Sequence, residues 1–547
     1  MSAIICMEVD LGENQFGLPS RLEEEIDGAP VLRHTVSRLT LSDDYRVVCI
    51  LRGGARAGAG KVREMLAGLD CEFLETDARD VPNREFLVRG RLWSLDSWRG
   101  GMGWTTYWDE WGAPAALAEA AVKFDADAVG FLTPDSPFAD PRLASEILAW
   151  HRDHIRKARI TLTGVPPGLA PAFLSRDVAE GYASENLTPA ASMAYRPSHP
   201  QRDLATSEAH FEADMALRTA PRRFTAHSLR QVEMLRALGS LGSSPRGASA
   251  DEAVATLCSH GEIQAGPVPA KIEIEPTSRC AAAPFYLADY AHGREACDMD
   301  PADFQKIAGS VAPYRDCLLT LEGLGDPLLH GSLAEMVSAA KEAGFLGVHV
   351  ATNGTALDAG AFAALRDAGL DVLSVRLGAD STEGYRRLYG ADGLEGAAAA
   401  LEAAFAERKE SGIARPLLAA EITKIRPLEA EIEPFYNHWL ANCDWPVIRP
   451  YNDFAGQIED HATIHMRTSA RIPCRKIFTE MYIDAEGVAW PCRQDINRTR
   501  PLGNAAEEGI RALWHCRFME DLRAAHEAGD RDFFPLCRNC KDWYYSI

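Results

Sequence analysis

The sequence predicts an α/β protein made of several domains, and three observations carry this prediction. Strand-like and helix-like segments alternate over roughly residues 1–180, and they alternate again from Lys271 onward. Four cysteines then stand in two pairs near the C-terminus. A chain of 547 residues is also longer than one hydrophobic core usually serves, so roughly two to four domains are expected.

The changes in pattern along the chain suggest where these domains begin and end. Residues 181–265 are hard to read, and GSSPRGAS within them has the composition of a linker. We expect a first domain, a linker, a central domain and a small cysteine-rich domain, with the bounds 1–235, 236–268, 269–465 and 466–547.

Charge and cysteine content limit the classes of partner. The net charge of −22 argues against nucleic acid or an anionic membrane as a general partner, because both repel an acidic surface. No apolar run is long enough for a membrane span. Thirteen cysteines, an odd number that is densest near the C-terminus, favour metal or cluster binding in a reducing cytoplasm over a disulfide framework.

The first region alternates strands with helices. AIICME, YRVVCIL and ADAVGFLTP have the apolar character of buried strands, whereas DGAPVLRHTVSRL, PAALAEAAVKF and PRLASEILAWHR have helical spacing. This alternation predicts a mostly parallel sheet that is doubly wound, with helices on both faces. Ligands are expected at the carboxyl ends of its strands.

Two motifs in this region resemble a known family. GLPSRLEEEIDGAPVL (Gly17–Leu32) resembles the nucleotide-binding loop of sugar nucleotidyltransferases of the CMP-sugar synthetase and spore-coat-polysaccharide type. TPDSPFADPRL (Thr133–Leu143) is similar to a second motif of that family. The resemblance implies a nucleotidyltransferase-like domain that binds a nucleotide through Arg21 and Asp135, with Asp135 holding Mg²⁺.

This chain departs from the family at three positions of that site. Glu13 stands where a phosphate would be repelled, Arg21 replaces a lysine, and Ala172 replaces a second acidic ligand. A triphosphate site without these charges lacks electrostatic stabilisation, so an inactive or altered nucleotidyltransferase is expected. Asp135 could instead cap the helix that follows it.

The central region repeats strand–loop–helix units. Strands are expected in KIEIEPTSRC, CLLTLEGLGDPLLH, FLGVHVATNGTAL, DVLSVRLGAD and RPLLAAEITKIRP, and polar or Gly residues follow most of them. Units of this length predict a full or partial β/α barrel whose site lies at the carboxyl ends of its strands.

These segments resemble the radical-SAM barrel. EGLGDPLLH is similar to the family's GGEPLLHP loop, whose backbone meets the amino group of S-adenosylmethionine, and ATNGT matches a third-strand motif. The resemblance implies that Gly323, Gly325, Asp326 and Asn353 bind the cofactor. Ser374 and Arg376, at the end of the next strand, could reach its ribose or carboxylate, or they could form an ordinary surface pair.

The family's cluster loop, CxxxCxxC, is incomplete in this chain. In TSRCAAAPFYLADY the first cysteine, Cys280, is present and would face the cofactor, but Pro284 and Leu287 occupy the other two positions. A cluster that cleaves S-adenosylmethionine needs three thiolates, so one cannot hold it. A non-standard site of Cys280, His292 and Cys297 is one alternative, and free thiols are the other.

The C-terminal cysteines form the most specific pattern. KIFTEMYIDAEGVAWPC predicts a hairpin with its turn at Asp484–Gly487, and four thiols suit either zinc or an iron–sulfur cluster. The order of these segments resembles the SPASM/twitch extension of radical-SAM enzymes. That resemblance implies one [4Fe-4S] cluster on Cys474, Cys492, Cys537 and Cys540, and a structural zinc site is the alternative.

Three functions therefore stay open. The first is an enzyme of the radical-SAM/SPASM type that acts on a nucleotide sugar or a related cell-surface precursor, with S-adenosylmethionine and Mg²⁺ as further cofactors. The second is a catalytically inactive homologue that serves as a binding or scaffold subunit beside a partner enzyme. The third is a protein whose zinc only fixes the fold.

Overall fold

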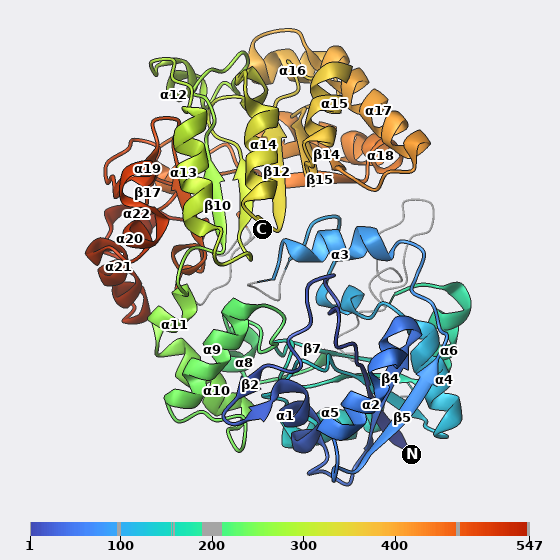
Figure 1. Ribbon diagram of the computed structural model, residues 1–547. Coiled ribbons are helices and arrows are strands. Elements are labelled where there is room, and N and C mark those ends of the chain that lie inside the picture. The colour runs from blue at the N-terminus through green and yellow to red at the C-terminus, as the bar shows by residue number, and fades with distance from the viewer. Residues whose placement is uncertain are drawn as a thin grey trace. The chain divides into compact units, whose positions relative to one another are not determined.

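A computed structural model of the chain describes residues 2–95, 100–154, 156, 159–188, 210–465 and 471–543. It divides into two compact units, Met1–Gln264 and Ala265–Ser546. Both are mixed α/β units with largely parallel sheets, which confirms the predicted class (Figure 1). Within the described ranges no helix combines the length and the apolar character needed to cross a bilayer.

Unit 1 is built on a seven-stranded sheet. Its first four neighbours, β5, β4, β1 and β6, run parallel, and β8 is antiparallel to both β6 and β7. Because β4 and β6 flank β1, the order of the strands reverses beside β1, and ligands commonly bind at such a point. In sheet order the strands are β5 Cys71–Thr76, β4 Arg46–Arg52, β1 Ala3–Glu8, β6 Ala128–Phe131, β8 Ala172–Ser175, β7 Ile160–Thr163 and β9 His210–Phe211.

Each face of this sheet carries its own hydrophobic core. Along β1, Ile5 and Met7 point into one core, while Ile4 and Cys6 point into the other, as the two-residue period of a strand requires. One core is covered by α1 Val31–Leu39, α2 Ala59–Met65, α5 Pro141–His154, α9 Leu229–Ser240 and α10 Ala250–Cys258, and the other by α4 Pro114–Lys123 and α6 Arg176–Glu185.

The segment 236–268, which we expected to be a linker, is largely helical. Helix α10 begins with a capping box in which the side chain of Ser249 accepts from the backbone N–H of Glu252. Its Val254 and Leu257 are buried in the core of unit 1. The helical spacing of these apolar residues, more than the Gly/Ser/Pro turn before them, decides how the segment folds.

Unit 2 contains a nine-stranded sheet in which β10 to β15 lie in sequence order. All five pairings among these six strands are parallel, so their carboxyl ends meet at one edge. These strands are β10 Lys271–Ile274, β11 Leu318–Leu321, β12 Gly347–Thr352, β13 Val372–Arg376, β14 Leu417–Lys424 and β15 Trp445–Pro450. The helices α13 Pro301–Val311, α14 Leu333–Glu342, α15 Ala359–Asp367, α16 Thr382–Tyr389, α17 Leu394–Ser411 and α18 Ile432–Asn442 lie between them in sequence.

The predicted C-terminal hairpin extends this same sheet. Strand β16 Glu480–Ile483 pairs in parallel with β10, Lys271 lying opposite Glu480, and β17 Val488–Trp490 returns antiparallel to β16. The turn between them contains Gly487 at φ +79°, a conformation that favours glycine. The cysteine-rich segment therefore shares one sheet and one core with strands β10 to β15.

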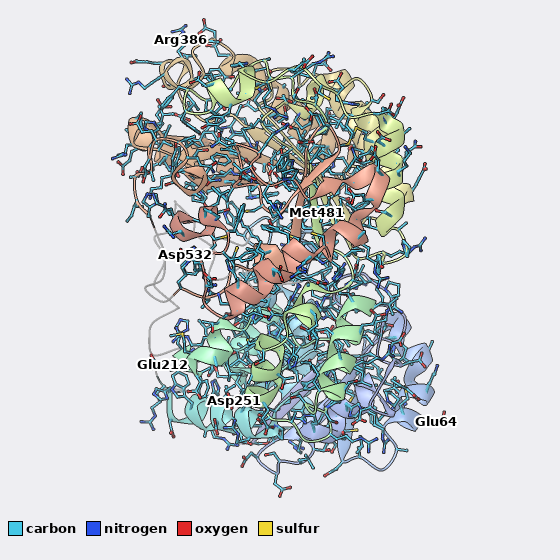
Figure 2. All side chains as sticks on the ribbon, turned by 90° about the vertical axis from the view of Figure 1, so that its left-hand side faces the viewer. Glu64, Glu212, Asp251, Arg386, Met481 and Asp532 are labelled. Carbon is cyan, nitrogen blue, oxygen red and sulfur yellow. The ribbon has the colours of Figure 1, made fainter. Side chains whose placement is uncertain are left out.

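The rest of the segment consists of β18 Gly503–Asn504, α19 Ala505–Glu508, α20 Ile510–Trp514, α21 Arg517–Glu527 and α22 Pro535–Asn539. Trp514 is fully buried and donates from Nε1 to the carbonyl oxygen of Ala265, 3.2 Å away. Met481 of β16 is only 2% exposed, whereas charged side chains such as Arg386 lie on the surface (Figure 2).

Candidate cofactor and metal sites

The Gly-rich loop after β11 lies tightly against the chain that follows β10. A Cβ at Gly323 would overlap the side chain of Glu275, and one at Gly325 would overlap the carbonyl oxygen of Thr277. The backbone N–H groups of Leu324 and Gly325 both donate to Glu275 Oε1 at 3.0 Å. The two glycines are therefore required by the close packing of the loop.

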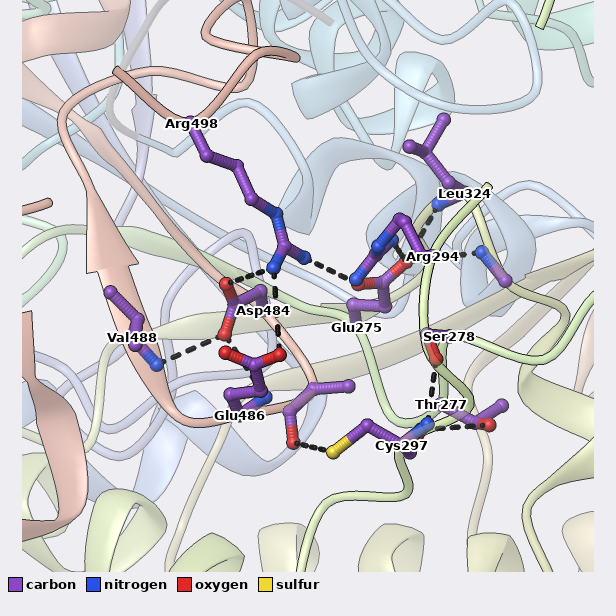
Figure 3. A network of polar contacts seen from close by, with 12 residues as sticks. Glu275, Thr277, Ser278, Arg294, Cys297, Leu324, Asp484, Glu486, Val488 and Arg498 are labelled. Atoms are coloured by element: carbon purple, nitrogen blue, oxygen red, sulfur yellow. Dashed lines mark hydrogen bonds and ion pairs between the residues drawn. The ribbon is translucent and has the colours of Figure 1, made fainter. Parts of the chain in front are cut away.

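Glu275 is the centre of a charged network at this edge of the sheet (Figure 3). Its carboxylate is fully buried and accepts from both terminal nitrogens of Arg294, at 2.7 and 2.6 Å. Arg498 lies 3.7 Å from Glu275, 3.2 Å from Asp484 and 3.8 Å from Glu486. The network thus joins the Gly-rich loop to the turn of the C-terminal hairpin.

Asp326, which we expected to bind the cofactor, forms hydrogen bonds with other residues of the protein. Its carboxylate accepts from Thr352 Oγ1 at 2.8 Å and from the backbone N–H of Asn353 at 2.9 Å. Burial raises its pKa, and these hydrogen bonds oppose the rise. The side chain of Asn353 in turn donates to the carbonyl oxygen of Ala282 at 3.0 Å. Three of the expected cofactor loops are thereby held together.

Cys280 stands without a second thiol in its loop. It donates to the carbonyl oxygen of Ala282 at 3.2 Å, and burial together with the charge of Asp326 raises its pKa to about 11. The backbone of Cys297 is hydrogen-bonded to Ser278, but its sulfur lies 3.6 Å from the carbonyl oxygen of Ala485, and His292 is exposed. In the described part of the chain no metal-binding group forms around these residues.

Aromatic side chains fill the surroundings of the cluster loop. Tyr286 packs edge-on against Phe285 and Tyr451, with ring centroids 5.2 and 5.0 Å apart, and His461 completes the group. Burial raises the pKa of Tyr286 to about 12. With one thiol and this aromatic packing, the loop does not fit a cluster that needs three protein thiolates.

Buried charges of both signs lie at or near the carboxyl ends of the parallel strands of unit 2. Arg376, at the end of β13, contacts Glu322 and lies 3.4 Å from Glu421. The other pairs are Arg449–Glu421 at 2.8 Å, Arg493–Glu322 at 2.7 Å and Arg493–Glu273 at 3.1 Å. Arg376 is therefore part of an ion-pair network and not an ordinary surface pair.

The protonation states in this network follow from burial and from the paired charges. Burial opposes ionisation of Glu421, but Arg449 and Arg376 outweigh it and lower the pKa to about 2. Burial lowers the pKa of His349 to about 3, so its ring is neutral at pH 7. Ser374 pairs with this ring, its Oγ lying 2.9 Å from Nε2.

The four C-terminal thiols lie near one another. Cys474 precedes β16, Cys492 follows β17, and Cys537 and Cys540 lie in and just after α22. Burial raises the pKa of each thiol. Neighbouring thiols raise the pKa of Cys492, Cys537 and Cys540 further, and Cys537 and Cys540 reach about 12. As the side chains stand, no three or more metal-ligating groups within the described ranges have the arrangement of a metal site.

The surroundings of these sulfurs suit negative charge. The backbone N–H groups of Gln494 and Asp542 donate to the sulfurs of Cys492 and Cys540, at 3.5 and 3.3 Å. Lys476 lowers the pKa of Cys474, Cys492 and Cys540, and Arg471 and Arg531 lower that of Cys537, in each case against the effect of burial. Four sulfur donors with such neighbours fit either an iron–sulfur cluster or zinc.

In unit 1 the two expected nucleotide-binding residues do not meet. Arg21 forms an ion pair with Glu24 at 3.5 Å. Asp135 is buried beyond the end of β6, and the amide of Gln15 approaches its Oδ2 at 3.4 Å. No hydrogen bond or ion pair joins Arg21 to Asp135 among the described residues.

The site around Asp135 also does not fit magnesium. Burial raises the pKa of Asp135, and the nearby Arg223 is a cation that opposes this rise. Glu110, the next carboxylate, is already paired with Arg91 at 3.1 Å and Arg223 at 2.6 Å. Mg²⁺ prefers one or two free carboxylates together with several waters, and this group offers the single buried carboxylate of Asp135 beside a cation.

Sequence reasoning missed several residues of both sites. Glu275, at the end of the alternating KIEIE, could have been noticed because a carboxylate at a strand end in a barrel commonly faces the site. Gln15, Glu110 and Arg223 carry no such signal, because they come together only through the fold of unit 1.

Comparison with known proteins agrees with the cysteine pattern. Residues 474–541 match the SPASM family, described as an iron-sulfur cluster-binding domain. All four cysteines fall within the match. The match supports iron–sulfur cluster binding by this segment.

Other similarities cover parts of the chain. A probable GTP 3′,8-cyclase of Methanothermobacter marburgensis is 31% identical over 133 residues, which cover 24% of this chain and 43% of that protein. The matched segments span 34% and 43% of the length of the curated relatives, which is less than half of each.

Two solved structures are similar at low scores. Streptococcus suis SuiB bound to precursor peptide SuiA has a TM-score of 0.41 and 14% identity, and the similarity covers 54% of this chain and 78% of that one. A cytidylyltransferase from Leptospira borgpetersenii has a TM-score of 0.33 and 13% identity, with 48% and 96% covered.

Proposed function

We propose that this chain is an iron–sulfur protein of the radical-SAM/SPASM type with one [4Fe-4S] cluster on Cys474, Cys492, Cys537 and Cys540. The observation that carries this proposal is the gathering of four thiols from three separate segments, with N–H donors on two of the sulfurs. The SPASM match over the same residues supports it. Such a cluster, when bound, supplies one-electron transfer.

The barrel is proposed to bind S-adenosylmethionine or a similar small molecule without cleaving it. The Gly-rich loop, Asp326 and Asn353 are held in one assembly, and Ser374 and Arg376 stand at the neighbouring strand end. The single thiol of Cys280 and the aromatic packing around Tyr286 argue against radical chemistry. The chain would therefore act as a binding or scaffold subunit beside a partner enzyme.

Unit 1 is proposed to be a nucleotidyltransferase-like module with altered activity that binds a nucleotide or a cell-surface sugar precursor. The motifs at Gly17–Leu32 and Thr133–Leu143 support this proposal, as does the reversal of strand order beside β1. Asp135 lies at that reversal, and Arg21 lies in the loop after β1.

Anaerobic reconstitution tests the cluster proposal. Iron and sulfide would be measured per chain, and EPR spectra would be recorded with and without S-adenosylmethionine. About four irons, with a signal that the cofactor leaves unchanged, is the expected result. About eight irons, with a signal that shifts on adding the cofactor, would establish a second cluster and the enzyme function. Zinc without sulfide would establish the structural zinc site.

A further inference from the structure

Arg223 is an incompletely paired cation in the interior of unit 1. Its side chain is fully buried, and its Nη2 forms an ion pair with Glu110 Oε2 at 2.6 Å. The guanidinium also lies 4.9 Å from the ring centroid of Phe16. Among the residues that the structure describes, its Nε and Nη1 have no hydrogen-bond partner. Unpaired N–H groups at full burial destabilise a protein unless something else accepts from them.

Asp135 is an incompletely paired carboxyl group in the same neighbourhood. It is 2% exposed, and its Oδ1 has no hydrogen-bond partner in the described part of the chain. The charge of Arg223 acts on Asp135, yet no ion pair joins the two side chains among the described residues. A backbone hydrogen bond links the two segments, because the N–H of Ala226, three residues after Arg223, donates to the carbonyl oxygen of Asp135 at 2.7 Å.

The position of this pair in the fold is one where ligands bind. Asp135 follows β6 and Gln15 follows β1, so both stand beyond the carboxyl ends of adjacent parallel strands. The strand order of the sheet reverses between these strands. Open α/β sheets bind ligands in the crevice outside such a reversal.

We infer that Arg223 and Asp135 together bind a small ligand that carries an oxyanion beside a hydroxyl group, without a divalent cation. The two unpaired N–H groups of Arg223 donate to the phosphate or carboxylate oxygens, and Asp135 Oδ1 accepts from the hydroxyl. A single carboxylate such as Asp135 holds Mg²⁺ poorly, so the guanidinium of Arg223 supplies the positive charge in place of the metal ion. This inference rests on the proposed small-molecule binding of unit 1, and it names the ligand chemistry.

The test is calorimetric titration of the full chain with three probes, namely inorganic phosphate, D-gluconate and CTP. Each probe is titrated once in buffer that contains EDTA and once in buffer that contains Mg²⁺. At least one probe should bind saturably in EDTA. Arg223→Lys should weaken that binding about tenfold, because it keeps the charge facing Glu110 but loses N–H donors. Asp135→Asn should weaken gluconate binding more than phosphate binding, because gluconate places alcohol hydroxyl groups beside its carboxylate and inorganic phosphate has none.

Arg91→Lys is the matched control, because Arg91 is equally buried and pairs with the same Glu110. It should leave the affinity for the probe unchanged, and thermal unfolding would show that the variants are folded. If Arg223→Lys does not fold, the test rests on Asp135→Asn. Its affinity for gluconate should then fall more than its affinity for phosphate. If CTP binds only in Mg²⁺, and the Arg223→Lys variant binds it with the same affinity as the wild-type chain, the inference is overturned. The proposal that unit 1 binds a nucleotide would still hold. No binding of any probe would overturn both.

Discussion

Arg294 binds Glu275 through both ends of its guanidinium, with Nη1–Oε1 and Nη2–Oε2 distances of 2.7 and 2.6 Å. The same carboxylate accepts from two backbone N–H groups of the Gly-rich loop, so one buried charge holds both a side chain and a loop. The geometry of the expected cofactor site therefore depends on a residue that does not itself face a cofactor.

Replacing that charge should loosen the site. Glu275→Gln leaves Arg294 without its partner, and breaking such a buried pair is expected to destabilise unit 2 by about 3 kcal/mol. Glu486→Gln is the control, because Glu486 is 58% exposed and its contact with Arg498 is long, at 3.8 Å. Urea unfolding measures both effects. Equal destabilisation by the two variants would contradict the central role of Glu275.

The close approach of the Gly-rich loop can be tested by adding one methyl group. Gly325→Ala would force a Cβ onto the carbonyl oxygen of Thr277, so a destabilisation of about 1–3 kcal/mol is expected. Gly331→Ala adds the same methyl where no atom lies within 4 Å, and it should change stability little. Thermal unfolding of the two variants compares them, and a Gly325→Ala protein as stable as Gly331→Ala would show that the loop can move aside.

Glu421 should make stability depend on pH. Its pKa falls from the ordinary value of 4.5 to about 2 in the folded chain, so its contribution is present above pH 4.5 and is lost as the pH falls toward 2. The contribution is on the order of 3 kcal/mol. Glu421→Gln should therefore be less stable than the wild-type chain at pH 7, and denaturant unfolding should show the gap narrowing between pH 4.5 and 2. A gap that stays constant would rule out this linkage.

The cluster ligands can be separated from the other thiols. Cys537→Ala is expected to lose most of the iron and to destabilise the C-terminal segment, because ligand binding and folding are coupled. Cys516→Ala, a half-buried cysteine of the same segment, should keep its iron. Iron and sulfide analysis after anaerobic reconstitution measures both. Full iron content in Cys537→Ala would disprove the ligand set.

Cys280 should be dispensable for iron binding. Its thiol has no cysteine neighbour in its loop, so Cys280→Ser is expected to hold as much iron as the wild-type chain. The wild-type chain, incubated with dithionite and S-adenosylmethionine, should form no 5′-deoxyadenosine above the level of a protein-free control. Loss of about half the iron in Cys280→Ser would point to a second cluster.

Local patterns predicted the strands, the hairpin and the position of the Gly-rich loop, because each depends on residues close together in sequence. The turn at Asp484–Gly487 and the glycines at 323 and 325 are examples, since backbone conformation or close packing restricts them to few residue types. Long-range partners could not be predicted in this way. No local pattern shows that β16 pairs with β10, or that Arg223 approaches Asp135.

The pairing of β16 with β10 also sets an order of events during synthesis. Residues 271–274 leave the ribosome more than two hundred residues before residues 480–483, which cover one edge of that strand. Until then the nascent sheet of unit 2 presents β10 as an open strand edge, the kind of surface that pairs with other chains. The hairpin before Cys492 therefore also covers this edge of β10, and a chain that stops before the hairpin leaves the edge exposed.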